Sequence, residues 1–215
     1  MNFKHFVVTD LRQQRSPFGD DVVVDEMDCL REYCQPAVLS QKVTDFVWII
    51  QAPAKMEKKL RDFSRDSNPT VMYAFSSVHY HDLFNLFTDD ETYCITTKLP
   101  HDIVLCDDHI QTIQNNFEWF VDSCAARRVV EFKYGYKYAL PSGVLFGPLV
   151  NECAPVTLFE DLEQTSKTQK VEQFGGIGWM QIVHDSSIDP TKEFEATDAE
   201  VHRMRRAFKR GFTGV

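Results

Sequence analysis

The sequence contains no run of about 18 apolar residues, the length that a membrane-spanning helix needs, which argues against helical membrane spans. Its first residues, MNFKHFVV, lack the basic start and the small-residue cleavage site of a secretory signal peptide. We therefore expect a soluble protein that works in the cytoplasm.

Paired cysteine motifs are also missing. The six cysteines, at positions 29, 34, 94, 106, 124 and 153, include no C-x-x-C pair and no spacing typical of a zinc site. Cys94, Cys106 and Cys124 stand among apolar neighbours. This pattern favours reduced, buried thiols over a disulfide framework.

Two nucleotide-binding motifs are absent. No G-x-G-x-x-G follows the first strand-like run, and no Walker A sequence occurs anywhere. The sequence therefore has neither the motif of a Rossmann dinucleotide-binding site nor that of a P-loop phosphate-binding site.

The 215 residues, 43% apolar and 13% aromatic, are ample for a hydrophobic core. We expect one globular domain over residues 1–190, followed by a basic helix or tail over 191–215. From His202 to Val215 the tail has five basic residues and no acidic residue, a charge of +5. Because the net charge of the chain is −9, all other residues together carry −14. Such a tail suits an anionic partner, although solvated terminal helices have the same composition.

Apolar runs and helical spacings alternate along the first half. Strands are predicted over 3–9, 46–50, 71–75, 93–97, 129–138 and 179–183, with a short apolar element over 144–150. Helices are predicted over 25–39 with Pro36 bending or ending it, 55–63, 81–87, 108–123 and 195–210, a helical turn over 157–163, and a polar loop over 163–172. This order predicts an α/β fold with a mostly parallel central sheet and flanking helices.

The segment 91–108, ETYCITTKLPHDIVLCDD, is the one around which we expect the site to be built. A strand-like run ends at Pro100 and is followed at once by His101 and Asp102. Ligand sites of open α/β sheets lie outside the carboxyl ends of strands. The alternative to a ligand site is that His101 and Asp102 form an ordinary turn, in which Asp102 caps the following helix.

Four segments, in this order, resemble one family, the rhamnosyl transferases, which are compact members of the glycosyltransferase-A superfamily. They are FKHFVVT at the first strand, LREYCQPAVLSQKVTDFVWII over 30–50, YCITTKL over 93–99, and WMQIVHD near the end. The resemblance spans about residues 3–188. It implies a Rossmann-like sheet, a nucleotide-diphosphate-sugar donor and a divalent metal at an acidic motif after the central strand.

The chain departs from the family at that acidic motif, where Pro100-His101-Asp102 keeps only one carboxylate. The resemblance implies that His184, at the end of its own strand, completes a site for Mn²⁺ or Mg²⁺ with Asp102. The alternative is a site without metal, in which Lys98, Arg65 or His101 neutralises the leaving diphosphate.

The resemblance also assigns the nucleotide pocket and the base. Thr9, Asp10 and Arg12, at the end of the first strand, lie where the superfamily begins its nucleotide pocket, unless they form a plain polar loop. Glu152 is the expected general base for the acceptor hydroxyl, with the runners-up Glu160 and Asp161.

The acceptor stays open between two classes. One is a surface glycan or its lipid-linked precursor, as for bacterial relatives. The other is a hydroxymethylated pyrimidine in DNA, as for the sugar transferases of bacteriophages and other viruses, and the basic residues Arg203, Arg206, Lys209 and Arg210 would then contact phosphates. A third reading is an inactive binding module that has kept the fold.

Overall fold

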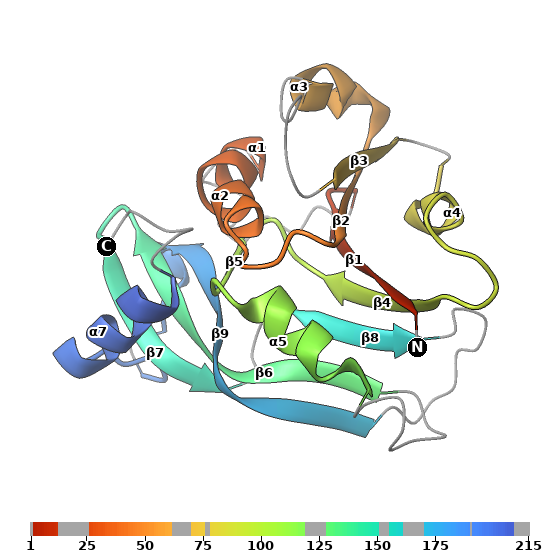
Figure 1. Ribbon diagram of the computed structural model, residues 1–215. Coiled ribbons are helices and arrows are strands. Elements are labelled where there is room, and N and C mark those ends of the chain that lie inside the picture. Colours follow the sequence, from red (N-terminus) through yellow and green to blue (C-terminus); the bar gives the residue numbers. More distant parts are fainter. Residues whose placement is uncertain are drawn as a thin grey trace.

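The computed structural model describes residues 2–12, 26–61, 70–75, 78–118, 128–150, 155–160, 170–189 and 191–208 (Figure 1). The strands are β1 (Phe3–Asp10), β2 (Val47–Ala52), β3 (Thr70–Phe75), β4 (Tyr93–Lys98), β5 (Ile103–Leu105), β6 (Arg128–Leu140), β7 (Val144–Val150), β8 (Val156–Glu160) and β9 (Lys170–His184). The helical elements are α1 (Glu26–Cys29), η1 (Leu30–Cys34), α2 (Gln35–Leu39), η2 (Ala54–Met56), α3 (Glu57–Arg61), α4 (Tyr80–Phe84), α5 (His109–Asn115), η3 (Asp185–Ser187) and α7 (Asp198–Ala207).

The described strands form one nine-stranded sheet in the order β3-β2-β1-β4-β8-β6-β9-β5, with β7 paired to β6 beside β8. Six of the nine, β1, β2, β3, β4, β6 and β9, run in one direction, and β5, β7 and β8 run in the other. The predicted α/β class with a mainly parallel sheet is confirmed. One consequence matters for function: the carboxyl ends of those six strands all point to the same edge.

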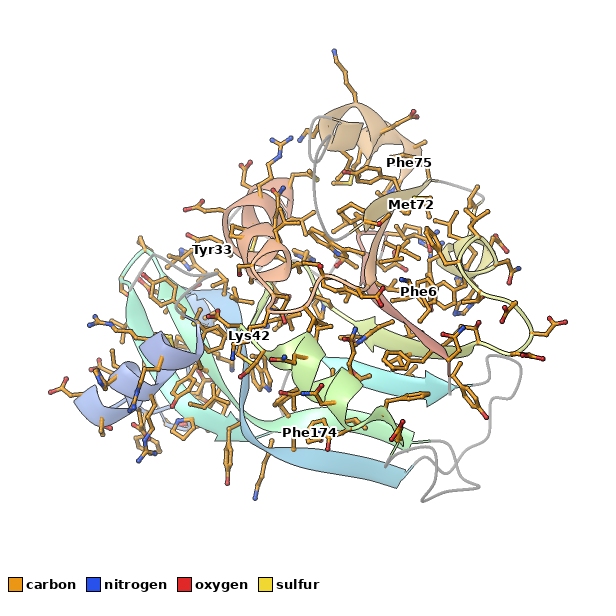
Figure 2. All side chains as sticks on the ribbon, in the orientation of Figure 1. Phe6, Tyr33, Lys42, Met72, Phe75 and Phe174 are labelled. Carbon is orange, nitrogen blue, oxygen red and sulfur yellow. The ribbon has the colours of Figure 1, made fainter. Side chains whose placement is uncertain are left out.

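Strand β2 explains why the sheet needs helices on both faces, because all six of its residues are buried. Trp48 and Ile50 pack into a cluster with α1, α2, α3 and α5, whereas Val47 and Ile49 pack on the opposite face with Phe84 of α4. Figure 2 shows side chains filling the space on both sides of β2, with Phe6 of β1 on the α4 side, where its ring stacks on Phe84 at 3.9 Å.

The predicted helix over 25–39 is present in the described part from Glu26 on, but Pro36 does not end it. The turn before it, η1, is π-helical, and Pro36 lies in the first turn of α2. Proline tolerates a first turn because its missing N–H has no helical partner there. The helix therefore runs on to Leu39.

Two other expectations are wrong. The segment expected as a helical turn over 157–163 begins as strand β8, which is inserted antiparallel between β4 and β6. The loop expected over 163–172 gives way at Lys170 to β9, which is much longer than the predicted 179–183. Strand β5, only three residues long, was not predicted.

The terminal helix α7 begins with a capping box between Thr197 and Glu200. Its buried residue Met204, and Phe208 directly after its last residue, pack with Tyr136, Leu145 and other side chains of β6, β7 and β9. Of the described helices, none has the length and apolar character that crossing a membrane requires.

Gly135 of β6 gives the first testable prediction, because the ring of the fully buried Trp179 lies against it. A Cβ at this position would meet Cε2 of Trp179 at 2.1 Å, and the ring has no exposed side to move toward. We expect Gly135→Ala to lower the free energy of unfolding by roughly 3 kcal/mol, the upper end of overpacking costs.

Urea unfolding measures this effect, and Gly175→Ala in β9 is the matched control because a Cβ there meets nothing within 4 Å. Equal stability of the two variants would show that the packing of Trp179 on Gly135 is not as described.

Candidate functional site at the carboxyl edge of the sheet

The chain order changes direction across the sheet between β1 and β4. From β1 the chain moves outward to β2 and β3, then returns to form β4 on the other side of β1. Val8 of β1 pairs with Lys98, the last residue of β4, so both strands end at the same edge, and β1 runs two residues farther, to Asp10. In open α/β sheets, the crevice outside such a switch point is where ligands bind.

Asp10 and Arg12, just at the end of β1, are tied together. Oδ1 of Asp10 accepts hydrogen bonds from the backbone N–H and the Nε of Arg12, both at 3.0 Å, and Oδ2 accepts one from Nη2 at 2.8 Å. Burial alone would raise the pKa of Asp10, but these bonds, with the charges of Arg12 and His79, hold it below its ordinary value. The Arg12 side chain keeps a third of its surface exposed, and the bonds to Asp10 fix its guanidinium in place.

Gln51, at the end of β2, holds the segment that follows β3. Its side chain is fully buried, with Nε2 donating to the carbonyl of Val78 at 2.7 Å and Oε1 accepting from the N–H of Tyr80 at 3.2 Å. The amide therefore fixes the start of α4 against the carboxyl end of β2.

Three rings gather where Gln51 holds the chain. The ring centroids of His79 and Tyr80 lie 4.4 Å apart, those of Tyr80 and His81 4.1 Å, and those of His79 and His81 4.6 Å. All three side chains are partly exposed. Burial, and then the charges of His79 and Lys98, lower the pKa of His81, against the opposing effect of Asp82.

Lys98 and His101 add two further polar side chains to this edge. Lys98 is exposed at the end of β4 and forms no ion pair within the described residues. His101 is buried, and its Nε2 has no hydrogen-bond partner there. With Arg12, these groups bring donors to the switch point, while Asp10 bonds to Arg12 and Asp82 accepts a hydrogen bond from the N–H of His79 at 2.9 Å.

Asp102 is buried and turned toward β9. Its Oδ2 accepts a hydrogen bond from Nε2 of Gln181 at 2.9 Å, and its carbonyl accepts one from the N–H of Ile182 at 2.8 Å. Burial raises the pKa of the nearby Cys29 thiol to about 12, and the charge of Asp102 adds to that shift.

His184 ends β9, two residues beyond the position alongside Asp102. Its Nδ1 lies 2.8 Å from Oγ of Ser186 and accepts from the N–H of Ser186 at 3.2 Å. Asp102 and His184 thus reach the same edge from neighbouring strands. Over the described ranges no three His, Cys, Asp or Glu side chains gather as a metal site would need, so the shared metal site stays a prediction.

Thr9 is not brought to this site. Its side chain is fully buried, and its Oγ1 accepts a hydrogen bond from Nε1 of Trp48 at 3.1 Å. The hydroxyl at the end of β1 satisfies the indole inside the core, which leaves Asp10 and Arg12 as the nucleotide-pocket candidates from this strand.

Of the three candidate general bases, only Glu160 lies within the described residues. Glu160 pairs with Cys94 near the start of β4, because β8 is antiparallel, and its backbone therefore lies at the end of β4 opposite to Lys98. Val156, where β8 begins, pairs with Lys98 at the site edge. Glu152 and Asp161, like Arg65, lie outside the described residues.

The basic helix lies apart from the switch point. In Figure 1, α7 covers the part of the sheet formed by β6, β7 and β9. Arg203 and Arg206 are exposed on it, while Lys209 and Arg210 lie outside the described residues. Their contact with an anionic acceptor stays a prediction.

Several site residues were missed by sequence reasoning, namely Gln51, His79, Tyr80, His81 and Gln181. Gln51 could have been found, since it ends a predicted strand in the same way as Asp10 ends the first. The rings at 79–81 stand at the start of the helix predicted over 81–87, where capping is the usual role of such residues.

Comparison with known proteins gives fold likenesses only at low similarity. No family model matches the chain, and no curated protein matches it. Among solved structures, 4-diphosphocytidyl-2C-methyl-D-erythritol synthase from Anaerococcus prevotii has 9% identity and a TM-score of 0.40, covering 93% of this chain and 95% of that chain. The inositol-1-phosphate CTP transferase from T. maritima has 11% identity and a TM-score of 0.38, covering 89% and 94%.

Mouse xyloside xylosyltransferase 1 has 10% identity and a TM-score of 0.33, and the match covers 62% of this chain and 53% of that chain. These identities and TM-scores are low, and the function is therefore inferred below from the residues of this chain.

Proposed function

We propose that this protein is a transferase of the glycosyltransferase-A kind, which moves a sugar from a nucleotide-diphosphate donor to an acceptor hydroxyl. The observation that carries the proposal is the set of cationic and imidazole side chains at the switch point, in a chain whose net charge is −9. They are Arg12, His79, His81, Lys98 and His101.

A diphosphate is the ligand that such a set suits best. The guanidinium of Arg12 is held rigidly by Asp10 and offers planar, paired donors, which match phosphate oxygens. Lys98 adds a point charge, and the unpartnered Nε2 of His101 adds one more polar group. Charge that develops on the leaving diphosphate would be stabilised by groups already in place.

The ring cluster suits the base of the nucleotide. His79, Tyr80 and His81 lie at the carboxyl ends of β2 and β3, beside Arg12. Stacking of a base on an aromatic side chain contributes about 1–3 kcal/mol. We assign the base to this cluster and the diphosphate to the span between Arg12 and Lys98.

A divalent metal fits this edge only in part. The carboxylate of Asp102 and the imidazole of His184 are ligand types that Mn²⁺ accepts, but Oδ2 of Asp102 already accepts from Gln181. Bound there, the ion would neutralise diphosphate charge. The deprotonation of the acceptor hydroxyl is proposed for Glu152.

The metal proposal predicts that Asp102→Ala and His184→Ala each reduce the Mn²⁺-dependent rate at least ~10-fold, because a sparse ligand set cannot spare one member. Steady-state rates with and without Mn²⁺ measure this. His202→Ala changes an exposed histidine on α7 and is the control. Wild-type rate and metal response in His184→Ala would contradict the shared site.

The experiment that tests the function is donor hydrolysis with a panel of nucleotide sugars, with and without Mn²⁺. The proposal predicts release of a nucleoside diphosphate from at least one donor. Failure to bind or cleave any donor would favour the inactive binding module.

A further inference from the structure

A second row of polar side chains begins at Asp102 and runs across β9 to β6. Gln181 of β9 and Lys137 of β6 are register partners on neighbouring parallel strands, so their side chains leave the sheet on the same face. Gln181 bonds to Asp102 on one side. Lys137 bonds to Glu193 on the other.

Lys137 and Glu193 form an ion pair that is almost completely buried. Nζ lies 2.6 Å from Oε1, and the side chains are only 12% and 8% exposed. A buried ion pair is weak evidence for stability, because desolvation costs about as much as the attraction returns. The second oxygen, Oε2 of Glu193, is buried without any hydrogen-bond partner among the described residues.

The backbone around Glu193 holds this carboxylate firmly. The N–H of Glu193 donates to the carbonyl of Asp189 at 2.9 Å, and the carbonyl of Phe194 accepts from the N–H of Gly147 at 3.0 Å. Farther on, Ala196 donates to Leu145 of β7 at 2.8 Å. The segment is thus fixed on the outer side of β7, with its one buried acid turned to Lys137.

We propose that the row formed by Asp102, Gln181, Lys137 and Glu193 is the acceptor subsite, and that it takes a neutral, polyhydroxylated carbohydrate. The inference rests on the proposed function. A hydroxyl group both donates and accepts, so it can donate to Oε2 of Glu193 and accept from the ammonium of Lys137. The buried Oε2 of Glu193, which has no partner in the described structure, favours ligands that supply its missing bond and rejects those that do not.

The charge of the row separates the two acceptor classes. The carboxylates of Asp102 and Glu193 and the ammonium of Lys137 give the row a formal charge of −1. The cationic side chains of Arg12 and Lys98 lie instead at the switch point. Phosphates of a DNA acceptor would be repelled by Asp102 and Glu193, and such repulsion is a common source of specificity. A carbohydrate hydroxyl meets no such penalty.

The row also lies in the right place for transfer. Asp102 begins the turn into β5, four residues after Lys98 of the donor site, and belongs to both. In the transfer, the bond from the anomeric carbon to the diphosphate oxygen breaks and a bond to the acceptor oxygen forms. The nucleoside diphosphate leaves with the electron pair, and the hydroxyl proton passes to the general base.

The test compares Glu193→Gln and Lys137→Met with wild type in steady-state transfer, using a panel of methyl glycosides and duplex DNA containing 5-hydroxymethylcytosine. We expect transfer to at least one glycoside, with an acceptor KM raised at least ~10-fold in both variants, as loss of a charged hydrogen bond implies. The Kd of the donor, measured without acceptor, should change far less.

Glu195→Gln is the matched control, because this acid stands two residues away and is exposed. Thermal unfolding of each variant separates lost folding from lost binding. If the ion pair of Lys137 and Glu193 were purely structural, the variants would be less stable, but their folded fraction would have the acceptor KM of the wild type. That outcome would overturn the subsite.

Transfer by the wild type to hydroxymethylated DNA and to no glycoside would also overturn it. The failure of the proposed function is a different result, since the wild type would then bind and cleave no donor at all.

Discussion

Lowering the pH from about 7.5 to about 5 is expected to reduce the free energy of unfolding by about 4 kcal/mol, because two histidines are buried in their neutral form. His5 of β1 and His109 of α5 are fully buried. Burial, and then the nearby His109, lower the pKa of His5 to about 3. Burial lowers the pKa of His109 to about 4, against the opposing effects of the Gly178 carbonyl and Asp108.

The direction of the effect follows from proton binding. Below the unfolded pKa of 6.5 the unfolded chain takes up protons at both positions, while the folded protein stays neutral there. Stability is therefore complete above pH 6.5 and is lost as the pH falls toward 4 and then 3. At pH 5 each histidine accounts for about 2 kcal/mol.

The hydrogen bonds of the two buried imidazole rings explain why His5 and His109 resist protonation in the folded protein. Nε2 of His5 lies 2.8 Å from Oγ1 of Thr97, which in turn lies 2.7 Å from Oγ1 of Thr157. Nδ1 of His109 lies 2.9 Å from the carbonyl of Gly178. Nδ1 of His5 and Nε2 of His109 have no partner in the described structure, so a second proton would find no acceptor.

Urea unfolding at both pH values measures the prediction. His5→Gln should lower stability at pH 7.5 but remove about half of the pH dependence, since one of the two groups is gone. His202→Gln, an exposed histidine, should leave the dependence unchanged. The same loss of stability at pH 5 in wild type and His5→Gln would contradict the account.

The second large effect concerns donor binding. Arg12→Gln combined with Lys98→Gln is expected to weaken nucleoside diphosphate binding at least ~100-fold, because each lost charged hydrogen bond costs about 1.5–3 kcal/mol. The two positions end adjacent strands on either side of the switch point. Calorimetric titration at several salt concentrations measures the affinity and should show a flatter salt dependence in the variant.

Lys4→Gln is the control for that loss of charge. Lys4 pairs with Asp45 at the amino end of β1, far along the strand from Arg12. A comparable weakening in the control would mean that net charge, and not this edge, attracts the nucleotide.

The fold was easiest to predict from the sequence where a strand consists almost entirely of apolar, buried residues. The apolar runs of β1 and β2, and the helices predicted between strands, were enough to predict a parallel sheet. Asp10 and Arg12, which the family resemblance assigned to the nucleotide pocket, and Lys98, named for a site without metal, end adjacent strands at one edge. Thr9 shows the limit of that rule, because its hydroxyl bonds to Trp48, 39 positions away.

Long-range pairing accounts for the other differences. Nothing in the local pattern of Val156–Glu160 says that it inserts between β4 and β6, and a short alternating segment fits a turn equally well. No local pattern marks Glu193 as a buried acid, because its partner Lys137 is 56 residues away. Such pairs depend on the packing of distant strands.

The central claim is that the edge outside β1 and β4 binds the diphosphate of a nucleotide donor. Titration of the wild type with nucleoside diphosphates and with the matching nucleosides tests it most directly. The account predicts at least one diphosphate that binds ~100-fold more tightly than its nucleoside, through charge-assisted bonds lost in the Arg12 and Lys98 double variant. Equal affinity for the two ligands, or diphosphate binding that the double variant keeps, would contradict it.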